Sequence, residues 1–485
     1  MSGPLSASAS DAARPRLTNK ILFVIAAMNL IDCINVNIMT PYAVEMVSTF
    51  LNKSPDSSDV HTTVSLLIGL YSLFEVIFSP FWGMVADRVG RRPCLLIGLA
   101  GSALAPILLG LGKSLPVIFA VRALDGFFCG NLGVTRTYLG EVVDKTNEAR
   151  GFSILALCFA MGLIVGPLLG GQLVFPARTA PSLFKGTLFD EYPFLLPNLT
   201  YAIFAAIAWI IGFFCMEETL PRSKRCVRTA SARHGMQLAL SEAVDAADGG
   251  DSADAGRTRS KCYPMTTIQV IVTYCGLAGT AVAQNSLVIL LLPDPRSLDG
   301  FDMGPQQISI ILNIGALGVI LCQLMLYPRL TKQMGFLNTF VLGFLLNSLA
   351  YGLYPVYGLF ADPVKYGLWR YVVLGLGQFV YMVGTFLMFP TAFAFINRAS
   401  EGLNRGTVNG FANAAGALSR AIAPSFASHL LDGCTGWGWF GRYIPFYIIT
   451  LVCGLFFTVS WSGLRKIDQA TTLPASAGGE EGSSA

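Results

Sequence analysis

The chain has 485 residues, of which 53% are hydrophobic and only 13% are charged, and its formal net charge is +4. Its mean hydropathy of +0.58 is higher than a soluble protein of this length can accommodate, which excludes an ordinary globular domain. The basic residues lie in loops and form no stripe with interleaved aromatic residues, which argues against a nucleic-acid partner.

Twelve apolar stretches of roughly the ~20 residues that a membrane-spanning helix needs follow one another along the chain. They lie at about 20–46, 62–82, 94–112, 115–138, 152–175 and 195–216, and then at about 266–292, 305–327, 336–357, 367–396, 407–430 and 441–463. Their length predicts helices, so the fold class is an all-α membrane protein with twelve transmembrane helices in two pseudo-symmetric six-helix bundles. The predicted segments are an N-terminal tail (1–19), a first bundle (20–216), a polar, low-complexity linker (217–264), a second bundle (265–463) and a C-terminal tail (464–485).

Lysine and arginine recur in alternate loops, and basic residues near helix ends are retained in the cytosol. The basic loops contain Arg88, Arg91, Arg92, Arg136, Lys145, Arg150, the linker, Arg329, Lys332, Arg398, Arg405, Arg465 and Lys466. We therefore expect a multi-pass protein with both tails in the cytosol, in the plasma membrane or a vacuolar or lysosomal membrane. The N-terminal tail lacks the apolar core and cleavage site of a signal peptide. Asn52 begins a glycosylation sequon in the first outer loop, which matters only if that loop faces a secretory lumen.

The residues that commonly carry enzymatic or metal chemistry are scattered. His61, His234 and His429 are far apart in the sequence, and no nucleophile constellation or phosphate-binding glycine loop occurs. Most of the eleven cysteines fall in apolar stretches, where they pack as small hydrophobic residues, and Cys226 and Cys262 lack the spacing of a zinc site. We expect no enzyme, no cofactor, no metal site and no disulfide framework.

The sequence WGMVADRVGRRP at 82–93 follows the second stretch. It resembles the loop signature G-x-x-x-D-R-x-G-R-R/K of the major facilitator superfamily, carried here by Gly83, Asp87, Arg88, Gly90, Arg91 and Arg92. The resemblance implies a latch that joins the two halves at the cytosolic face when the transporter is open outward. We expect Asp87 to accept from free amides at a neighbouring helix start, and Glu141 to pair with the arginines. The alternative is plain retention of basic residues in a cytosolic loop.

The corresponding loop of the second half, YPRLTKQMG at 327–335, looks like a decayed copy of this signature with Lys332 in place of the aspartate. This pairing supports an internal repeat. The major facilitator resemblance covers the chain from about residue 20 to 464, apart from the linker.

Two further elements resemble the drug:proton antiporter and zinc-induced-facilitator-like branch of that superfamily. The fifth stretch carries G-x-x-x-G-P-x-x-G-G at Gly162, Gly166, Pro167, Gly170 and Gly171. The sequence EETLP at 217–221 resembles the ending of the first half in such members. Small residues let helices approach closely and proline bends a helix, so the alternatives are a generic packing stripe and a polar helix exit.

Charged and polar residues inside the apolar stretches mark a central cavity, because such groups are costly toward lipid. Arg122 belongs to a segment resembling the family's R-x-x-x-G element, and Asp125, one turn later, is its expected partner. Asp32 and Glu75 are candidate proton carriers, because desolvation raises a carboxyl pKa toward neutrality. The alternatives are that Arg122 snorkels outward, or that a carboxylate pairs with it permanently or binds a cationic substrate.

The remaining cavity candidates are amides and other polar side chains, which line a cavity or bridge helices. They are Asn35 in the first stretch and Gln284, Asn285, Asn313, Gln378, Tyr381, Asn409, Asn413 and Arg420 in the second half.

Taken together, the resemblance implies a secondary transporter that moves a small organic solute by alternating access, coupled to protons in an export direction. A nutrient facilitator or symporter and a membrane solute sensor are the alternatives. The expected partners are the small-molecule substrate, protons and lipid, and the expected oligomeric state is a monomer.

Overall fold

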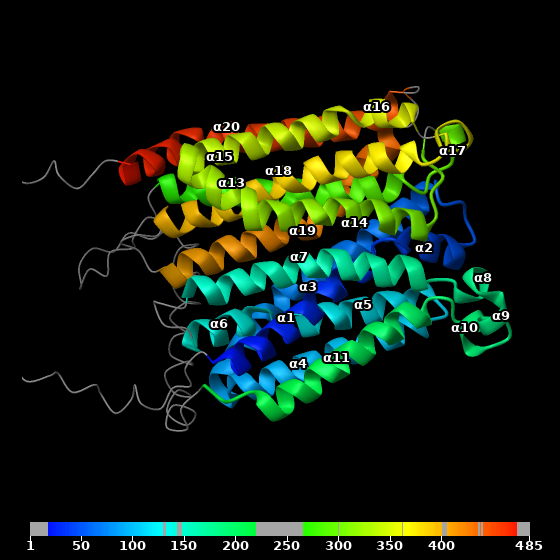
Figure 1. Cartoon of the computed structure of the whole chain (residues 1–485), viewed down its shortest axis with the longest axis horizontal. Helices are drawn as coiled ribbons and strands as arrows, with labels where there is room; N and C mark the ends of the chain where they lie inside the picture. Colours follow the sequence, from blue (N-terminus) through cyan, green and yellow to red (C-terminus); the bar gives the residue numbers. More distant parts are fainter. Residues whose placement is uncertain are drawn as a thin grey trace, which may run out of the picture.

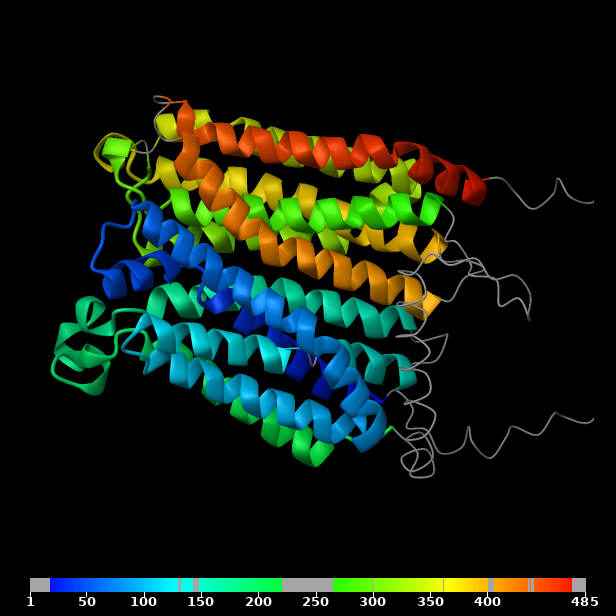
Figure 2. The same ribbon diagram turned by 180° about the vertical axis from the view of Figure 1, so that it is seen from behind.

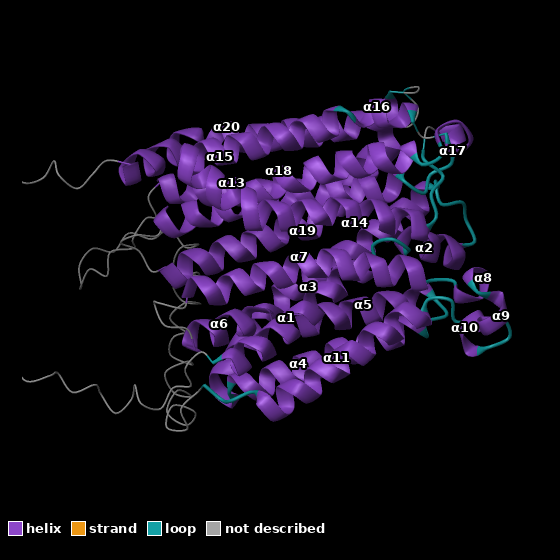
Figure 3. Ribbon diagram, viewed as in Figure 1, coloured by secondary structure: helices purple, strands orange, loops and turns teal. Residues whose placement is uncertain are grey.

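The structure, a computed structural model, describes residues 18–129, 132–142, 148–219, 265–298, 300–360, 362–399, 405–434, 437 and 440–472. Within these ranges the chain is helical and contains no strand, and the long helices run side by side (Figure 3). The tail at 1–17 and the linker at 220–264 lie outside the described residues, so their predicted roles stay predictions.

The first half begins with a helix that stops earlier than predicted. Its elements are α1 (Asn19–Ile38), α2 (Ala43–Leu51), α3 (Ser58–Val89), α4 (Arg91–Gly110), α5 (Leu115–Cys129), α6 (Leu132–Val142), α7 (Glu148–Leu173), α8 (Pro176–Thr179), α9 (Pro181–Phe184), α10 (Leu188–Glu191) and α11 (Leu195–Cys215). The predicted stretch 20–46 breaks between α1 and α2, where Pro41 lacks a backbone N–H and restricts the residue before it.

The signature at 82–93 is mostly helical, contrary to the expectation of a loop. Helix α3 continues to Val89 and α4 starts at Arg91, so the reversal between them is made at Gly90. Gly90 has φ = 120°, a conformation that a residue with a Cβ rarely adopts.

The second half repeats this organisation. Its elements are α13 (Met265–Leu291), η1 (Arg296–Leu298), α14 (Pro305–Leu321), η2 (Cys322–Leu326), α15 (Tyr327–Gly352), α16 (Tyr354–Leu359), α17 (Pro363–Tyr366), α18 (Trp369–Ala399), α19 (Arg405–Cys434), η3 (Gly441–Tyr443) and α20 (Ile444–Thr472). Gly335, with φ = 79° and ψ = 175°, interrupts α15 between the eighth and ninth predicted stretches. Helix α20 runs to Thr472, so the predicted boundary at 464 falls inside a helix.

Equivalent helices pack in equivalent pairs. In the first half α1 packs on α7, α4 on α11 and α3 on α5; in the second half α13 packs on α19, α15 on α20 and α14 on α18. The halves meet along two seams, α3 with α19 and α7 with α14 (Figures 1 and 2). The two seams are equivalent, because α3 corresponds to α14 and α7 corresponds to α19. The packing therefore has the pseudo-symmetry that the internal repeat predicts.

The bundle has two end faces (Figure 1). We call the end where α1 begins and α20 finishes the terminal face. We call the opposite end, which carries α2, α8–α10, α16 and α17, the connector face.

Among the described residues, the large cluster of buried apolar side chains that both halves share lies toward the connector face. One cluster joins Val60 and Val64 of α3 to Leu287 of α13 and Ala427 of α19. Toward the terminal face, one separate cluster is built from the first half and another from the second half. The halves are thus packed together at the connector face and have separate cores toward the terminal face.

Nine helices in the described part of the chain are long and apolar enough to cross a membrane. One of them, Pro305–Leu359, contains the break at Gly335, and α7 contributes a shorter apolar helix at Leu157–Leu173. Large apolar side chains such as Phe214 and Leu451 are 76% and 72% exposed on the outer surface, where lipid rather than water suits them. The protein is a multi-pass membrane protein, and the count of twelve spans stays a prediction.

Candidate functional site

A buried ion pair lies in the first half. Helix α5 carries Arg122 and Asp125 one turn apart, with Nη1 of Arg122 2.8 Å from Oδ2 of Asp125. The other carboxylate oxygen, Oδ1, accepts a 2.6 Å hydrogen bond from Nδ2 of Asn35 on α1. Arg122 is 4% exposed and Asp125 is 2% exposed, so the arginine does not snorkel outward and its partner is the expected one.

The guanidinium of Arg122 also lies over an aromatic ring. Its Cζ is 4.4 Å from the ring centroid of Tyr71 on α3, a cation–π contact. The hydroxyl of Tyr71 donates to Sγ of Cys129 on α5 at 2.5 Å. Neither Tyr71 nor Cys129 was predicted as a site residue; the available signal was that Tyr71 lies one turn before Glu75.

The two remaining carboxyl groups of the predicted cavity lie on the same helices. Asp32 is 7% exposed and lies one turn before Asn35 on α1, so both point to one side of that helix. Glu75 is half-buried, one turn beyond Tyr71 on α3. The ion-pair partner of Arg122 is Asp125, so the geometry does not support a permanent pair between Asp32 and Arg122.

The signature arginine Arg91 is held by two carboxylates near the terminal face. Its Nη2 is 2.8 Å from Oδ1 of Asp87 and 2.9 Å from Oε1 of Glu141. Glu141 is the partner that the sequence led us to expect. Arg91 is 5% exposed, so this is a packed contact rather than a solvated loop charge.

At the start of α4 the carboxylate that accepts from the free amides is Glu218 rather than Asp87, and the expected capping role of Asp87 at a neighbouring helix start stays a prediction. The two carboxylate oxygens of Glu218 accept from the backbone N–H groups of Arg91 at 2.9 Å and Arg92 at 3.2 Å, the first residues of α4. A Cβ on Gly90 would lie 2.2 Å from Oε2 of Glu218. The glycine is therefore needed both for its φ and for the close approach of this carboxylate.

The polar segment after α11 docks onto the same cluster. The hydroxyl of Thr219 donates to Oε2 of Glu141 at 2.6 Å, and the hydroxyl of Tyr138 donates to the carbonyl of Glu217 at 2.9 Å. The EETLP element is thus more than a polar helix exit, although its last two residues, 220–221, lie outside the described residues.

The contacts described for the signature all lie within the first half. Arg88 is exposed, and Nη2 of Arg92 donates to the carbonyl of Phe213 at 2.5 Å. Gly83 and Asp87 border a hollow of about 250 Å³ that is lined only by α3, α4 and α6. This agrees with the separate cores at the terminal face.

The glycines of the fifth stretch face α1. A Cβ on Gly162 would lie 2.5 Å from Cβ of Cys33, and one on Gly170 would lie 1.9 Å from the carbonyl oxygen of Ile38. Gly166, which lies between these two glycines on α7, approaches α1 in the same close way, and Pro167 follows it in the same helix. Gly171 instead faces the other half, where a Cβ would lie 2.4 Å from Cβ of Ser309 on α14. The motif therefore packs α7 tightly on α1 and allows the α7–α14 seam.

The polar residues predicted in the second half separate into three groups, apart from Asn409. Gln284 donates to Oγ1 of Thr450 and the hydroxyl of Tyr381 donates to the carbonyl of Ala281, so both bridge helices. Both amide atoms of Gln378 and Oδ1 of Asn313 are buried without a hydrogen-bond partner in the described residues. Asn285, Asn413 and Arg420 are half-buried, and the side chain of Asn409 lies outside the described residues.

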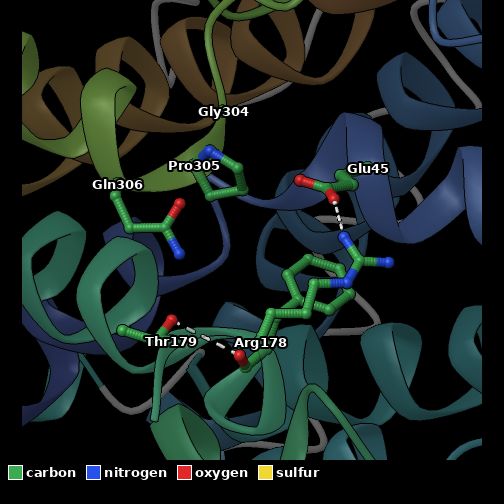
Figure 4. A pocket seen from close by; sticks show the side chains of 7 residues that line it. Glu45, Arg178, Thr179, Gly304, Pro305 and Gln306 are labelled. Atoms are coloured by element: carbon green, nitrogen blue, oxygen red, sulfur yellow. Dashed lines mark hydrogen bonds and ion pairs between the residues drawn. The ribbon is translucent and has the colours of Figure 1, made fainter. Parts of the chain in front are cut away.

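A second hollow, of about 350 Å³, opens at the connector face between α2, α8 and the start of α14 (Figure 4). Oε1 of Glu45 lies 2.9 Å from Nη1 of Arg178, whose guanidinium covers the ring of Phe175. This hollow is distinct from the buried cluster around Arg122.

One cluster was missed entirely. His61 of α3 contacts Asp432 of α19 and Asp294, which follows α13, so it bridges the two halves at the connector face. The histidines look isolated in the sequence, because the residues that contact His61 are 371 and 233 positions away.

Two repeated helical halves, joined at one face and enclosing buried charges, define the class of the protein as a multi-pass membrane transporter. The Major Facilitator Superfamily model matches residues 22–250. The chain is 28% identical to the major facilitator superfamily multidrug transporter mfsB of Aspergillus fumigatus, with 84% of this chain and 78% of the relative covered. It is also 28% identical to ZINC INDUCED FACILITATOR 1 of Arabidopsis thaliana, with 75% of this chain and 74% of the relative covered.

Among solved structures, the human organic anion transporter MFSD10 superposes with a TM-score of 0.59 at 20% identity, covering 91% of this chain and 99% of that one. These relatives are transporters rather than enzymes. The chain is thus similar to major facilitator superfamily transporters over most of its length, and the family model matches its first half.

Proposed function

We propose that the protein is a proton-coupled antiporter that exports a small organic solute by alternating access. The observation that carries this proposal is the buried cluster of Asp32, Asn35, Arg122 and Asp125. It provides a fixed ion pair and, one turn away on α1, a further buried carboxyl group.

The division of labour within this cluster follows from charge. Arg122 and Asp125 neutralise one another, and Asn35 fills the remaining oxygen of the carboxylate. A buried carboxyl without an equal counter-charge is most stable when protonated. Asp32 is then the residue that takes up and releases the transported proton, with the half-buried Glu75 as its relay toward α3.

The driving force is sufficient for export. One pH unit supplies about 1.4 kcal/mol per proton, and 100 mV supplies about 2.3 kcal/mol per charge. The multidrug transporter among the relatives supports an organic substrate and an export direction.

The other sites take roles in the same cycle. The terminal face is the cytosolic face, in the plasma membrane or a vacuolar or lysosomal membrane, and the protein acts as a monomer. The signature around Asp87 and Arg91 latches the halves at the terminal face when the transporter is open outward. Residues 217–264 link the two bundles. Both amide atoms of Gln378 and Oδ1 of Asn313, which have no hydrogen-bond partner in the described part of the chain, bind polar groups of the substrate.

The test is uptake of a panel of drugs, metal chelates and amino-acid-like solutes into proteoliposomes, with and without an imposed pH gradient. We expect an opposing proton gradient to stimulate transport of at least one organic solute. Asp32→Asn should remove this stimulation while leaving downhill exchange intact, because the amide cannot carry the proton. Asp190→Asn, an exposed aspartate on α10, is the matched control and should behave as the wild type. Gradient-independent equilibration by the wild type would instead identify a facilitator.

A further inference from the structure

A second buried charged cluster joins the two halves at the connector face. Nδ1 of His61 lies 2.8 Å from Oδ1 of Asp432, and Nε2 of the same ring lies 3.2 Å from Oδ1 of Asp294. The other oxygen of Asp294 is paired with Arg442. The side chains of His61 and Asp294 are 0% exposed and that of Arg442 is 3% exposed, so water does not screen these charges.

Each carboxylate that flanks His61 belongs to a residue with a further contact that helps to hold it in position. The carbonyl of Asp294 accepts from the N–H of Asp302 at 2.8 Å, and a Cβ on Gly300 would lie 2.2 Å from that carbonyl. The loop after α13 is therefore folded tightly around Asp294. The second carboxylate, Asp432, also accepts from the hydroxyl of Ser58 at 2.7 Å.

The hydrogen-bonding pattern of the ring requires an extra proton. A neutral imidazole has one N–H and one lone pair, whereas an imidazolium donates from both nitrogens. Here both nitrogens face carboxylate oxygens, so a neutral ring would bring a lone pair against an anion. The closed cluster consequently binds one proton more than a neutral ring with two carboxylates.

The charge balance leads to the same result. Arg442 is the cation paired with Asp294, and the side chain of Asp432 is 18% exposed. A protonated His61 places a positive charge between the two carboxylates, opposite in sign to both. The charged and titratable groups around the ring are Asp294 from the loop after α13, Asp432 and His429 from α19, Arg442 from η3, and Asp56, Asp59 and Lys53 near the start of α3.

We propose that His61 is a proton-binding site that holds the connector face closed, distinct from the Asp32 site of the transported proton. Both carboxylates that contact the ring belong to the second half, so opening the connector face separates the ring from them and returns it to water. The proton is then lost at neutral pH, because histidine ordinarily titrates between about pH 5 and 8. Acid therefore favours the closed connector face.

The consequence for transport depends on the proposed orientation. If the connector face is the outer face, a proton arriving from outside closes that side and returns the carrier to the state open toward the cytosol. Because the site opens only to the connector face, this proton gates the conformational change and is not itself carried across.

The experiment measures the conformational equilibrium without any substrate. Spin-labelled amino acids replace the exposed residues Thr49 on α2 and Val364 on α17, and the distance between them is recorded in lipid nanodiscs from pH 5.5 to 8. In the wild type the ratio of closed to open molecules should rise by up to about tenfold for each unit that the pH falls. His61→Gln should flatten this dependence.

A second variant guards against a folding defect in His61→Gln. Asp432→Asn keeps the shape of the cluster, lets Nδ1 face a neutral amide and allows a neutral ring to donate to Asp294. It should remain closed across the whole pH range, with the slope removed.

Two controls separate this site from other titrating groups. His429→Gln, an exposed histidine on α19, should keep the wild-type slope, because its charge is screened by solvent. Asp190→Asn, an exposed aspartate on α10, should also keep it. Wild-type slopes in both His61→Gln and Asp432→Asn would overturn the proposal, as would loss of the slope in His429→Gln alone.

Discussion

At the scale of single residues, the deep position of Arg122 is tolerated because each of its neighbours has a specific contact. Asp125 supplies the opposite charge, Asn35 satisfies the second carboxylate oxygen and Tyr71 provides the face of its ring. A single unpaired charge at this depth would cost about 2.5–3.5 kcal/mol or more. The residues act as a unit, so removing one of them leaves the remaining buried polar groups without their partner and destabilises the protein.

We predict that Asp125→Asn destabilises the protein strongly, because it leaves the buried guanidinium without an anion. Breaking a buried pair from one side typically costs about 3–5 kcal/mol. The measurement is the midpoint of thermal unfolding of the purified protein in detergent. Asp190→Asn, on the exposed α10, should change the midpoint little, and an equal effect of the two substitutions would contradict the prediction.

At the scale of elements, the tight packing of α7 on α1 depends on the absence of a Cβ. Gly170→Ala would put a Cβ 1.9 Å from the carbonyl oxygen of Ile38, and backbone must move to relieve the overlap. Overpacking of this kind costs about 1–3 kcal/mol. We expect a clear loss of thermal stability.

The matched control is Gly83→Ala, since no atom lies within 4 Å of the Cβ that it adds. Alanine is favoured over glycine in a helix by about 1 kcal/mol. This variant should be neutral or slightly stabilised, and equal destabilisation by both substitutions would argue against close packing as the reason for the motif.

The start of α4 supplies a second prediction at this scale. Glu218→Gln removes the negative charge that faces two backbone N–H groups at the N-terminus of α4. The free energy of unfolding should fall by about 0.3–1 kcal/mol. Hydrogen exchange of the amides of Arg91 and Arg92 reports the loosening directly. Glu217→Gln is the control, because Glu217 is exposed and only its backbone carbonyl takes part in the described contact. Unchanged exchange in Glu218→Gln would contradict this role.

At the scale of the whole molecule, transport requires the seams at the connector face to separate. Nε2 of Gln172 on α7 donates to Oγ of Ser309 on α14 at 2.8 Å, across the halves. We predict that a bifunctional thiol cross-linker between Gln172→Cys and Ser309→Cys holds the connector face closed and stops transport in proteoliposomes. Each single substitution, treated in the same way, should remain active. Persistent transport by the cross-linked protein would rule out alternating access through this seam.

The extent of prediction from sequence differs between features for a physical reason. The apolar stretches and the pair of Arg122 with Asp125 are local patterns, since the pair is only three positions apart. Helix ends were less well predicted, because residues such as Gly90 and Gly335 end or interrupt a helix through a single dihedral angle. The role of Glu218 at the start of α4 was not predicted, because it depends on the path of the chain after α11.

The sequence by itself determined the membrane environment, the helical class and the family signature, because hydropathy and short motifs depend on neighbouring residues. Only the tertiary structure decided which face is closed and which charges meet there. His61 and its two carboxylates lie on separate halves, and their contact depends on how α3 packs against α19. No local pattern encodes that packing, because it is the sum of many weak contacts spread over the whole length of both helices.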